Sequence, residues 1–279
     1  MKVVICTSLF YSRLVRWDSD FLELFVKNCS NWLPGCEVFL AADGDRPKRV
    51  KGATLLPLPE PPPDQSKYQY WAMHRPLEAL LDATDADIVY SSHIDNLLDT
   101  NPTTKFEQVL SENAVGMSDI IDNNISRMPS RHITCPSIAT NCAVFNAKLY
   151  RKLKLKLQDQ CVVDHLLKGD ARMLNGSIYS FDRGVWFLMT WYLHMTGQKW
   201  LFHPLRTTHL LRLGTLHHTM HRIYAGCKGK SDCISRWYEH ETSLRNFQRR
   251  FREEVGRDSS ITDEQIAKTK AAYEANMAS

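Results

Sequence analysis

The chain has 279 residues, of which 43% are hydrophobic and 24% charged, and its formal net charge is +4 at pH 7. This balance is typical of a globular protein with a sizeable core, and it argues against a disordered chain or a strongly basic nucleic-acid-binding protein. No apolar run approaches the roughly 18 residues that span a membrane. The first run, residues 3–6, is too short for a secretion signal. We therefore expect a cytoplasmic protein, with its eight cysteines as free thiols.

The first part of the chain alternates short strand-forming runs with an amphipathic segment. Residues 3–8, 37–42 and 54–58 are apolar and rich in strand formers. Between the first two runs, residues 21–32 carry apolar side chains at helical spacing, and Pro34-Gly35 ends that pattern. Strands that alternate with a helix predict an α/β protein with a mostly parallel sheet and helices packed on it.

A proline-rich segment, residues 57–63, precedes a helix that we predict over residues 68–81 despite Pro76. Lys67 and Arg75 lie near or within this helix. The simplest interpretation of both is a solvated charge, and the functional alternative is a cation that faces a pyrophosphate. No glycine-rich phosphate-binding pattern follows the first strand, so a bound nucleotide would be held in some other way.

The stretch that carries most information is residues 87–98. A short apolar strand, residues 88–90, breaks into polar residues before Leu97-Leu98 resumes the apolar pattern. His93 and Asp95 are two residues apart, and in an extended chain such residues point to the same side and would converge on one ligand. Ligands of open α/β sheets bind at the carboxyl ends of the strands. The alternative is a turn in which Asp95 bonds its own backbone.

The rest of the chain continues the alternation and ends in a helical tail. We predict strands over residues 114–117, 138–146 and 200–202. We predict helices over residues 101–113, 149–157, 185–195 and within 235–279. Residues 118–137 form a long polar segment, of a kind that is more often functional than idle.

Candidate site residues in this part are a carboxylate, an asparagine pair and a group of histidines. Asp182 lies just before the helix expected at residue 185, where a carboxylate would also act as a cap. Asn141 and Asn146 flank an apolar run, and turn chemistry would explain them equally well. Imidazole is the commonest metal ligand. Four histidines fall within thirteen residues: His209, His217, His218 and His221.

In this order along the chain, the segments resemble a GT-A type glycosyltransferase, most closely the glycogenin and lipopolysaccharide glycosyltransferase branch. His93-Ile94-Asp95 stands where that family carries a D-x-D motif at the end of a strand. Residues 140–150 are similar to the asparagine, small, apolar, asparagine segment of the branch. The branch also places a histidine from a late His-and-Gly loop on a metal ion. The candidates here are His209, Gly214, His217 and His218.

The resemblance covers residues 1–225 and implies a GT-A (Rossmann-like) catalytic domain with a mixed, mostly parallel central sheet flanked by helices. Residues 1–100 would bind the nucleotide sugar, residues 101–225 the acceptor, and residues 226–279 would form a helical tail. The implied activity is a hexosyl- or pentosyltransferase. It would move a sugar from a nucleotide-diphosphate sugar to a hydroxyl of a glycan or glycoprotein acceptor, with no nucleic-acid partner.

The resemblance also implies roles for the site residues. A divalent ion, Mn²⁺ or Mg²⁺, would lie on the donor diphosphate, held by Asp95 and a late histidine, with His93 in place of the first aspartate. The ion would act as a Lewis acid toward the leaving diphosphate, with Lys67 or Arg75 adding positive charge. Asp182 is the candidate general base. The remaining donor-binding candidates are Thr7, Ser8, Asp43 and Asn141.

Other hypotheses stay open beside this one. A zinc module would use His217, His221, Cys227 and Cys233, although structural zinc prefers more closely spaced pairs. A non-catalytic protein that binds a sugar nucleotide or glycan on the same fold is favoured by His93 in place of an aspartate. A nucleotidyltransferase ranks lower, because no glycine-rich Lys/Arg pattern lies near the first strand.

Overall fold

A seven-stranded sheet, in the order β3-β2-β1-β4-β7-β6-β8, forms the centre of the molecule. The computed structural model describes residues 1–9, 19–42, 49–57, 68–120, 138–154, 193, 196–203, 205–210 and 230–278. Four neighbouring strands run parallel: β3 (Thr54–Pro57), β2 (Glu37–Ala42), β1 (Val3–Leu9) and β4 (Ile88–Ser92). The predicted mixed, mostly parallel α/β sheet is confirmed.

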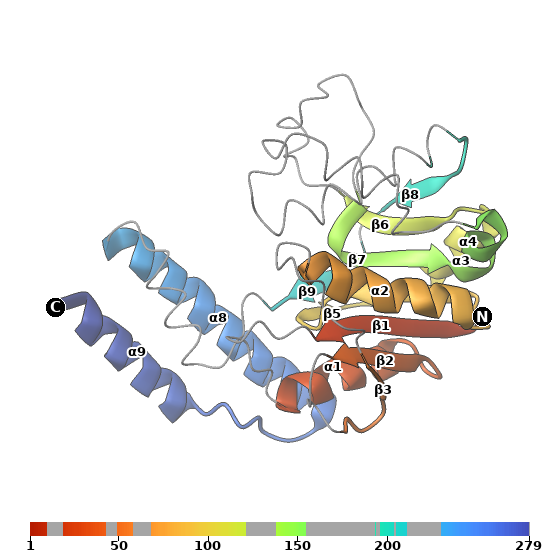
Figure 1. Ribbon diagram of the computed structural model, residues 1–279. Coiled ribbons are helices and arrows are strands. Elements are labelled where there is room, and N and C mark those ends of the chain that lie inside the picture. The colour runs from red at the N-terminus through yellow and green to blue at the C-terminus, as the bar shows by residue number, and fades with distance from the viewer. Residues whose placement is uncertain are drawn as a thin grey trace.

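The other half of the sheet begins with β7 (Ile138–Asn146), a strand that is antiparallel to both of its neighbours. These neighbours are β4 and β6 (Gly116–Ile120), and β8 (Trp200–Phe202) lies parallel to β6. A separate two-stranded sheet joins β5 (Asn96–Leu98) to β9 (Thr207–His209). In Figure 1 this small sheet lies at the carboxyl end of β1, on the left of the main sheet.

Helices cover both faces of the sheet, and the strand sequences show why. Alternate residues of a strand face opposite sides. Val4, Cys6 and Val89 share one core cluster with α2 (Tyr68–Ala83) and α4 (Ala147–Leu153). Ile5, Ile88 and Tyr90 share the other with α1 (Ser19–Trp32), α3 (Thr103–Ser111) and α8 (Lys230–Val255). The strands are therefore apolar on both sides, as buried parallel strands are.

Several element boundaries differ from the sequence prediction, among them the starts of β6 and α4. β6 starts at Gly116, not at residue 114, because Ala114 and Val115 are buried in the connection after α3: the Ala114 N–H bonds Val109 and the Val115 N–H bonds Lys199. Asn146 caps α4 by accepting a hydrogen bond from the Leu149 N–H at 3.0 Å, so turn chemistry explains this asparagine. The helix expected over residues 185–195 and the proline-rich segment fall largely outside the described residues.

The C-terminal helices are joined to the core. Phe247 of α8 stacks on Phe21 of α1, with ring centroids 4.2 Å apart and an interplanar angle of 18°. Phe251 is buried in the same cluster, as is Ile266 of α9 (Asp263–Ala278). α9 runs beside α8 toward the C-terminus (Figure 1). Among the described residues no helix combines the length and apolar character needed to cross a membrane.

Among the cysteines whose side chains the structure describes, Cys6, Cys29 and Cys36 are free thiols. Burial raises the pKa of the Cys6 thiol to about 12 and that of Cys36 to about 11. Because the thiolate is the reactive form, both behave at neutral pH as small apolar side chains.

His240 of α8 makes the stability depend on pH. It is buried, neither ring nitrogen has a hydrogen-bond partner in the part of the chain that the structure describes, and burial lowers its pKa from 6.5 to about 4. Between these values an unfolded chain binds a proton that the folded chain does not, so stability falls as the pH drops through this window. We expect the lowered pKa of His240 to reduce the free energy of unfolding by about 2 kcal/mol when the pH falls from 7 to 5.

Urea unfolding of the wild type and of His240→Leu at the two pH values measures this cost. The variant should lose less stability on acidification than the wild type by about that amount. An equal pH dependence in both proteins would assign the effect to other groups.

Candidate functional site

The candidate site begins where β4 ends. The strand stops at Ser92, and residues 94 and 95 form a turn that closes with a hydrogen bond from the Asn96 N–H to the His93 carbonyl at 3.1 Å. The expectation that residues 93–95 are extended is therefore wrong, because β5 must leave the main sheet here to pair elsewhere. Ile94 is buried, whereas His93 and Asp95 are half-buried. Ile94 thus anchors the turn in the core, and the two polar residues are only partly exposed.

The two-stranded sheet places the backbone of His209 beside this turn. β9 pairs antiparallel with β5, with His209 opposite Asn96, and the Leu210 N–H donates to the Asp95 carbonyl at 2.6 Å. The backbone of His209 therefore lies next to Asp95. The side chain of His209 is not among those described, and His217 and His218 lie outside the described residues altogether.

Two buried polar side chains that have no hydrogen-bond partner among the described residues lie at the same end of the sheet. Thr7, on the strand next to β4, is 2% exposed, and its hydroxyl oxygen has no partner. Asn96 is 1% exposed, and neither its amide oxygen nor its nitrogen has one. Such a group costs about 1–3 kcal/mol, and nearly all buried polar groups are paired. Both residues are therefore candidates for contact with a ligand.

Thr7 was predicted from the sequence as a donor-binding residue, whereas Asn96 was not. A sequence signal for Asn96 exists, since this amide directly precedes the apolar pair Leu97-Leu98. Its proximity to Asp95 in the sequence made a turn the simpler explanation. Its burial is visible only in the structure.

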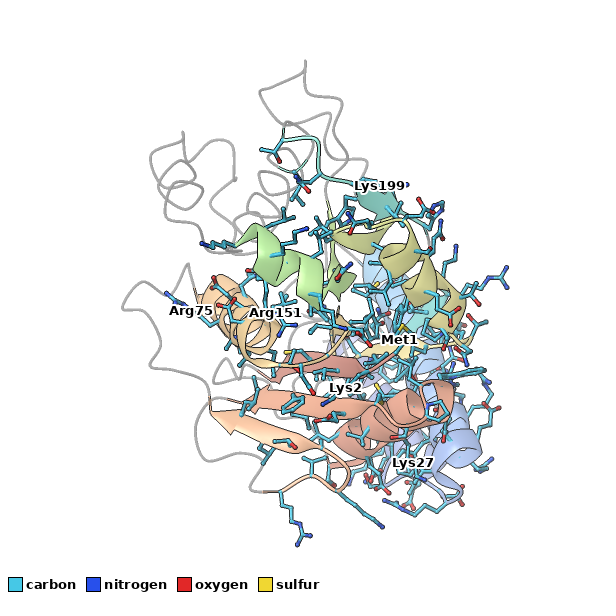
Figure 2. All side chains as sticks on the ribbon, turned by 90° about the vertical axis from the view of Figure 1, so that its right-hand side faces the viewer. Met1, Lys2, Lys27, Arg75, Arg151 and Lys199 are labelled. Carbon is cyan, nitrogen blue, oxygen red and sulfur yellow. The ribbon has the colours of Figure 1, made fainter. Side chains whose placement is uncertain are left out.

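The structure describes some of the remaining predicted site residues and not others. Asn141 precedes Cys142, which pairs with Ser92 at the end of β4, so the Asn141 backbone lies next to the candidate site. Ser8 belongs to β1, and the side chains of both residues are not described. Arg75 is exposed on the outer side of α2 (Figure 2). Three further candidates lie outside the described residues: Asp43, Lys67 and Asp182.

The opposite end of the sheet, where the parallel strands begin, carries ion pairs that join neighbouring elements. Figure 2 looks onto this end, where Met1 and Lys2 lie. The Lys2 ammonium pairs with Glu37 at 3.0 Å and Asp85 at 2.5 Å, and Lys148 pairs with Asp87 at 2.5 Å. Lys148 holds the pKa of the Asp87 carboxyl below its usual range. These carboxylates are paired with neighbouring cations, whereas the described residues offer no hydrogen-bond partner to the side chains of Thr7 and Asn96 at the carboxyl end of the strands.

Of the side chains predicted to hold a metal ion, the structure describes those of His93 and Asp95. Within the described part of the chain, no three or more His, Cys, Asp and Glu side chains gather as a metal site. Asp95 offers carboxylate oxygens, and the His209 backbone lies beside it. A carboxylate and an imidazole leave positions for phosphate oxygens, a mixed set that Mn²⁺ accepts. For the zinc hypothesis, His217, His221 and Cys227 are not described, and Cys233 belongs to α8.

Comparisons with known proteins return solved structures of glycosyltransferases. No protein-family model matches the sequence, and no curated protein matches it. The galactosyltransferase LgtC in complex with donor and acceptor sugar analogues is 14% identical over 95% of this chain and 99% of its own, with a TM-score of 0.48. An active-site mutant of LgtC is 13% identical over 94% and 98%, with a TM-score of 0.49.

The glycosyltransferase GlyE of Streptococcus pneumoniae TIGR4 is 12% identical over 72% of this chain, with a TM-score of 0.42. The chain spans 45% of the length of GlyE. Over most of its length, this chain is similar to solved structures of glycosyltransferases.

Proposed function

We propose that the protein is a metal-dependent glycosyltransferase, which transfers a sugar from a nucleotide-diphosphate sugar to a hydroxyl of a glycan or glycoprotein. One observation carries the proposal. Asp95, in the turn that follows β4, lies beside the backbone of His209 at the carboxyl end of the parallel strands. That end is where open α/β sheets bind ligands. The D-x-D-like motif and a late histidine are the two parts that the resembled family uses to hold its metal.

The proposed roles follow from the charge that develops in the reaction. Breaking the bond between sugar and phosphate leaves negative charge on the diphosphate. Asp95 and His209, with His93 nearby, would hold a divalent ion, Mn²⁺ or Mg²⁺, which when bound supplies a Lewis acid to that diphosphate. Lys67 and Arg75 are the candidates for a further positive charge.

The acceptor side of the reaction needs a base, and the donor needs polar contacts. Asp182 is our candidate to take the proton from the attacking hydroxyl. The Thr7 hydroxyl, which is buried on β1 and has no partner among the residues that the structure describes, is suited to a hydrogen bond with the base or ribose of the donor. Ser8, Asp43 and Asn141 are proposed for the same donor site.

The proposal is tested by screening the wild-type protein with UDP-hexoses, UDP-pentoses and GDP-hexoses, with and without Mn²⁺. We expect one nucleotide sugar to raise the melting temperature only when Mn²⁺ is present, and to be turned over, by hydrolysis or by transfer to an added glycan. If no nucleotide sugar changes the melting temperature under any metal condition, the enzyme hypothesis is wrong.

A non-catalytic protein on the same fold is the second candidate, and His93 is the observation that favours it. An imidazole in place of the first aspartate removes one negative charge from the proposed site. The same screen separates the two functions. Stabilisation by a nucleotide sugar without hydrolysis or transfer, at any Mn²⁺ concentration tested, would identify a binding protein.

A further inference from the structure

Arg250 of α8 reaches across to the strand that follows the candidate site. Its side chain is 9% exposed. One guanidinium nitrogen donates to the Leu98 carbonyl of β5 at 2.8 Å, and another pairs with the Asp99 carboxylate. The Glu254 carboxylate, one helical turn along α8, accepts from Nε at 2.9 Å and from Nη2 at 2.6 Å. A single buried arginine therefore ties the C-terminal helix to the end of β5.

Helix α1 holds the same residue of β5 from its own side. The Asn28 amide nitrogen donates to the Leu98 carbonyl at 2.9 Å, and its oxygen accepts from the Leu98 N–H at 2.8 Å. The same amide nitrogen also lies 3.0 Å from Glu254. The open edge of β5 is thus satisfied by side chains of α1 and α8, while its other edge pairs with β9.

The Asp99 carboxylate extends this network to β9. Its second oxygen accepts a hydrogen bond from the Thr208 hydroxyl at 2.8 Å, and the Asp99 N–H donates to the Arg206 carbonyl at 3.0 Å. Thr208 is the residue before His209. A continuous set of contacts therefore runs from Arg250 through Asp99 to Thr208, next to the backbone that lies against Asp95.

We infer that Arg250 is a positioning residue for the donor site: it fixes the β5–β9 pair and thereby the place of His209 relative to Asp95. The inference rests on the proposed function. The planar guanidinium bonds two carboxylates and a carbonyl in fixed directions, which a lysine ammonium does not. Buried ion pairs add little net stability, and their best-attested use is to define one geometry. A shift of about 1 Å in a positioned group can cost about a hundredfold in rate.

The test compares Arg250→Met and Arg250→Lys with Arg257→Met. Arg257 also joins the C-terminal region to α1, by contacts with Glu23 at 2.6 Å and Asp20 at 3.4 Å, and so controls for loss of an arginine at that interface. All proteins are studied well below their melting temperatures. The lysine variant keeps the positive charge, and it serves if the methionine variant fails to fold.

Three quantities are measured on each protein. Hydrogen exchange reports the protection of the amides of residues 96–98 and 207–210. Calorimetry reports the affinity of Mn²⁺ in the presence of UDP or GDP, together with the affinity of the nucleotide alone. We expect both Arg250 variants to exchange these amides about tenfold faster or more, and to bind Mn²⁺ about 10- to 100-fold more weakly, with metal-free nucleotide binding unchanged. Arg257→Met should match the wild type in all three measurements.

The outcomes separate this inference from the proposed function. If the wild type binds Mn²⁺ with nucleotide and the Arg250 variants bind it equally well, the positioning role is wrong and the proposed function stands. Unchanged amide exchange in the variants also overturns the role. If the wild type binds neither UDP nor GDP with Mn²⁺, the proposed function fails, and the positioning role fails with it.

Discussion

Replacing Asp95 with asparagine should reduce sugar transfer about a thousandfold, which corresponds to about 4 kcal/mol of lost transition-state stabilisation. The substitution keeps the shape of a half-buried side chain but removes the charge that would hold the divalent ion beside His209. The Mn²⁺-dependent rise in melting temperature with the nucleotide sugar should disappear as well. kcat/KM for the donor identified by screening and a thermal-shift titration with Mn²⁺ measure the two effects.

Glu107→Gln is the matched control for Asp95→Asn. Glu107 is an exposed carboxylate on α3, and its loss changes the net charge by the same amount. It should leave both activity and the metal-dependent stabilisation unchanged. If Asp95→Asn keeps activity to within about tenfold of the wild type, the metal is held elsewhere and the motif is not the site.

Truncating Phe247 to alanine should destabilise the whole protein by about 3–5 kcal/mol. Its ring is fully buried, stacks on Phe21 and lies 5.7 Å from the ring of Phe251, and removal leaves a cavity between α1 and α8. Because these helices share one core cluster with the sheet, the loss should appear as a single shifted unfolding transition. Urea unfolding followed by tryptophan fluorescence and by circular dichroism measures it.

Tyr238 provides the matched control on the same helix. It is an aromatic residue that is 63% exposed, so Tyr238→Ala should change the free energy of unfolding by no more than about 0.5 kcal/mol. Two separate transitions, or a cost below about 1 kcal/mol for Phe247→Ala, would mean that the C-terminal helices fold apart from the sheet.

The elements with strong local signals could be predicted from the sequence. Residues 37–42 and 138–146 are predicted as strands with the bounds that the structure has, because both are short runs rich in apolar strand formers. The helix around Pro76 was also predicted despite that proline, since the apolar spacing on both sides of it outweighed the break. The spacing of apolar residues within one segment depends only on neighbours in the chain, so it can be seen in the sequence itself.

The parts that depend on distant partners could not be predicted. Thr207–His209 has no alternating apolar pattern, and it becomes a strand because it pairs with β5 and because the Thr208 hydroxyl donates a hydrogen bond to Asp99. Asn28 has the sequence features of an ordinary helical residue, yet it satisfies both peptide groups of Leu98. The candidate site was therefore predicted as a motif, whereas the contacts that hold the motif in place were not.

The packing of α8 on α1 has a consequence for how the chain folds during synthesis. Asn28 and Glu254, which bond each other across this interface, are 226 residues apart in the sequence. At about 5–20 residues per second, a ribosome needs about 10–45 s to make that separation. Throughout this interval the face of α1 that carries Phe21 and Phe25 has no α8 to cover it, and it is a suitable surface for a chaperone. Packing of this face therefore waits until α8 has been made.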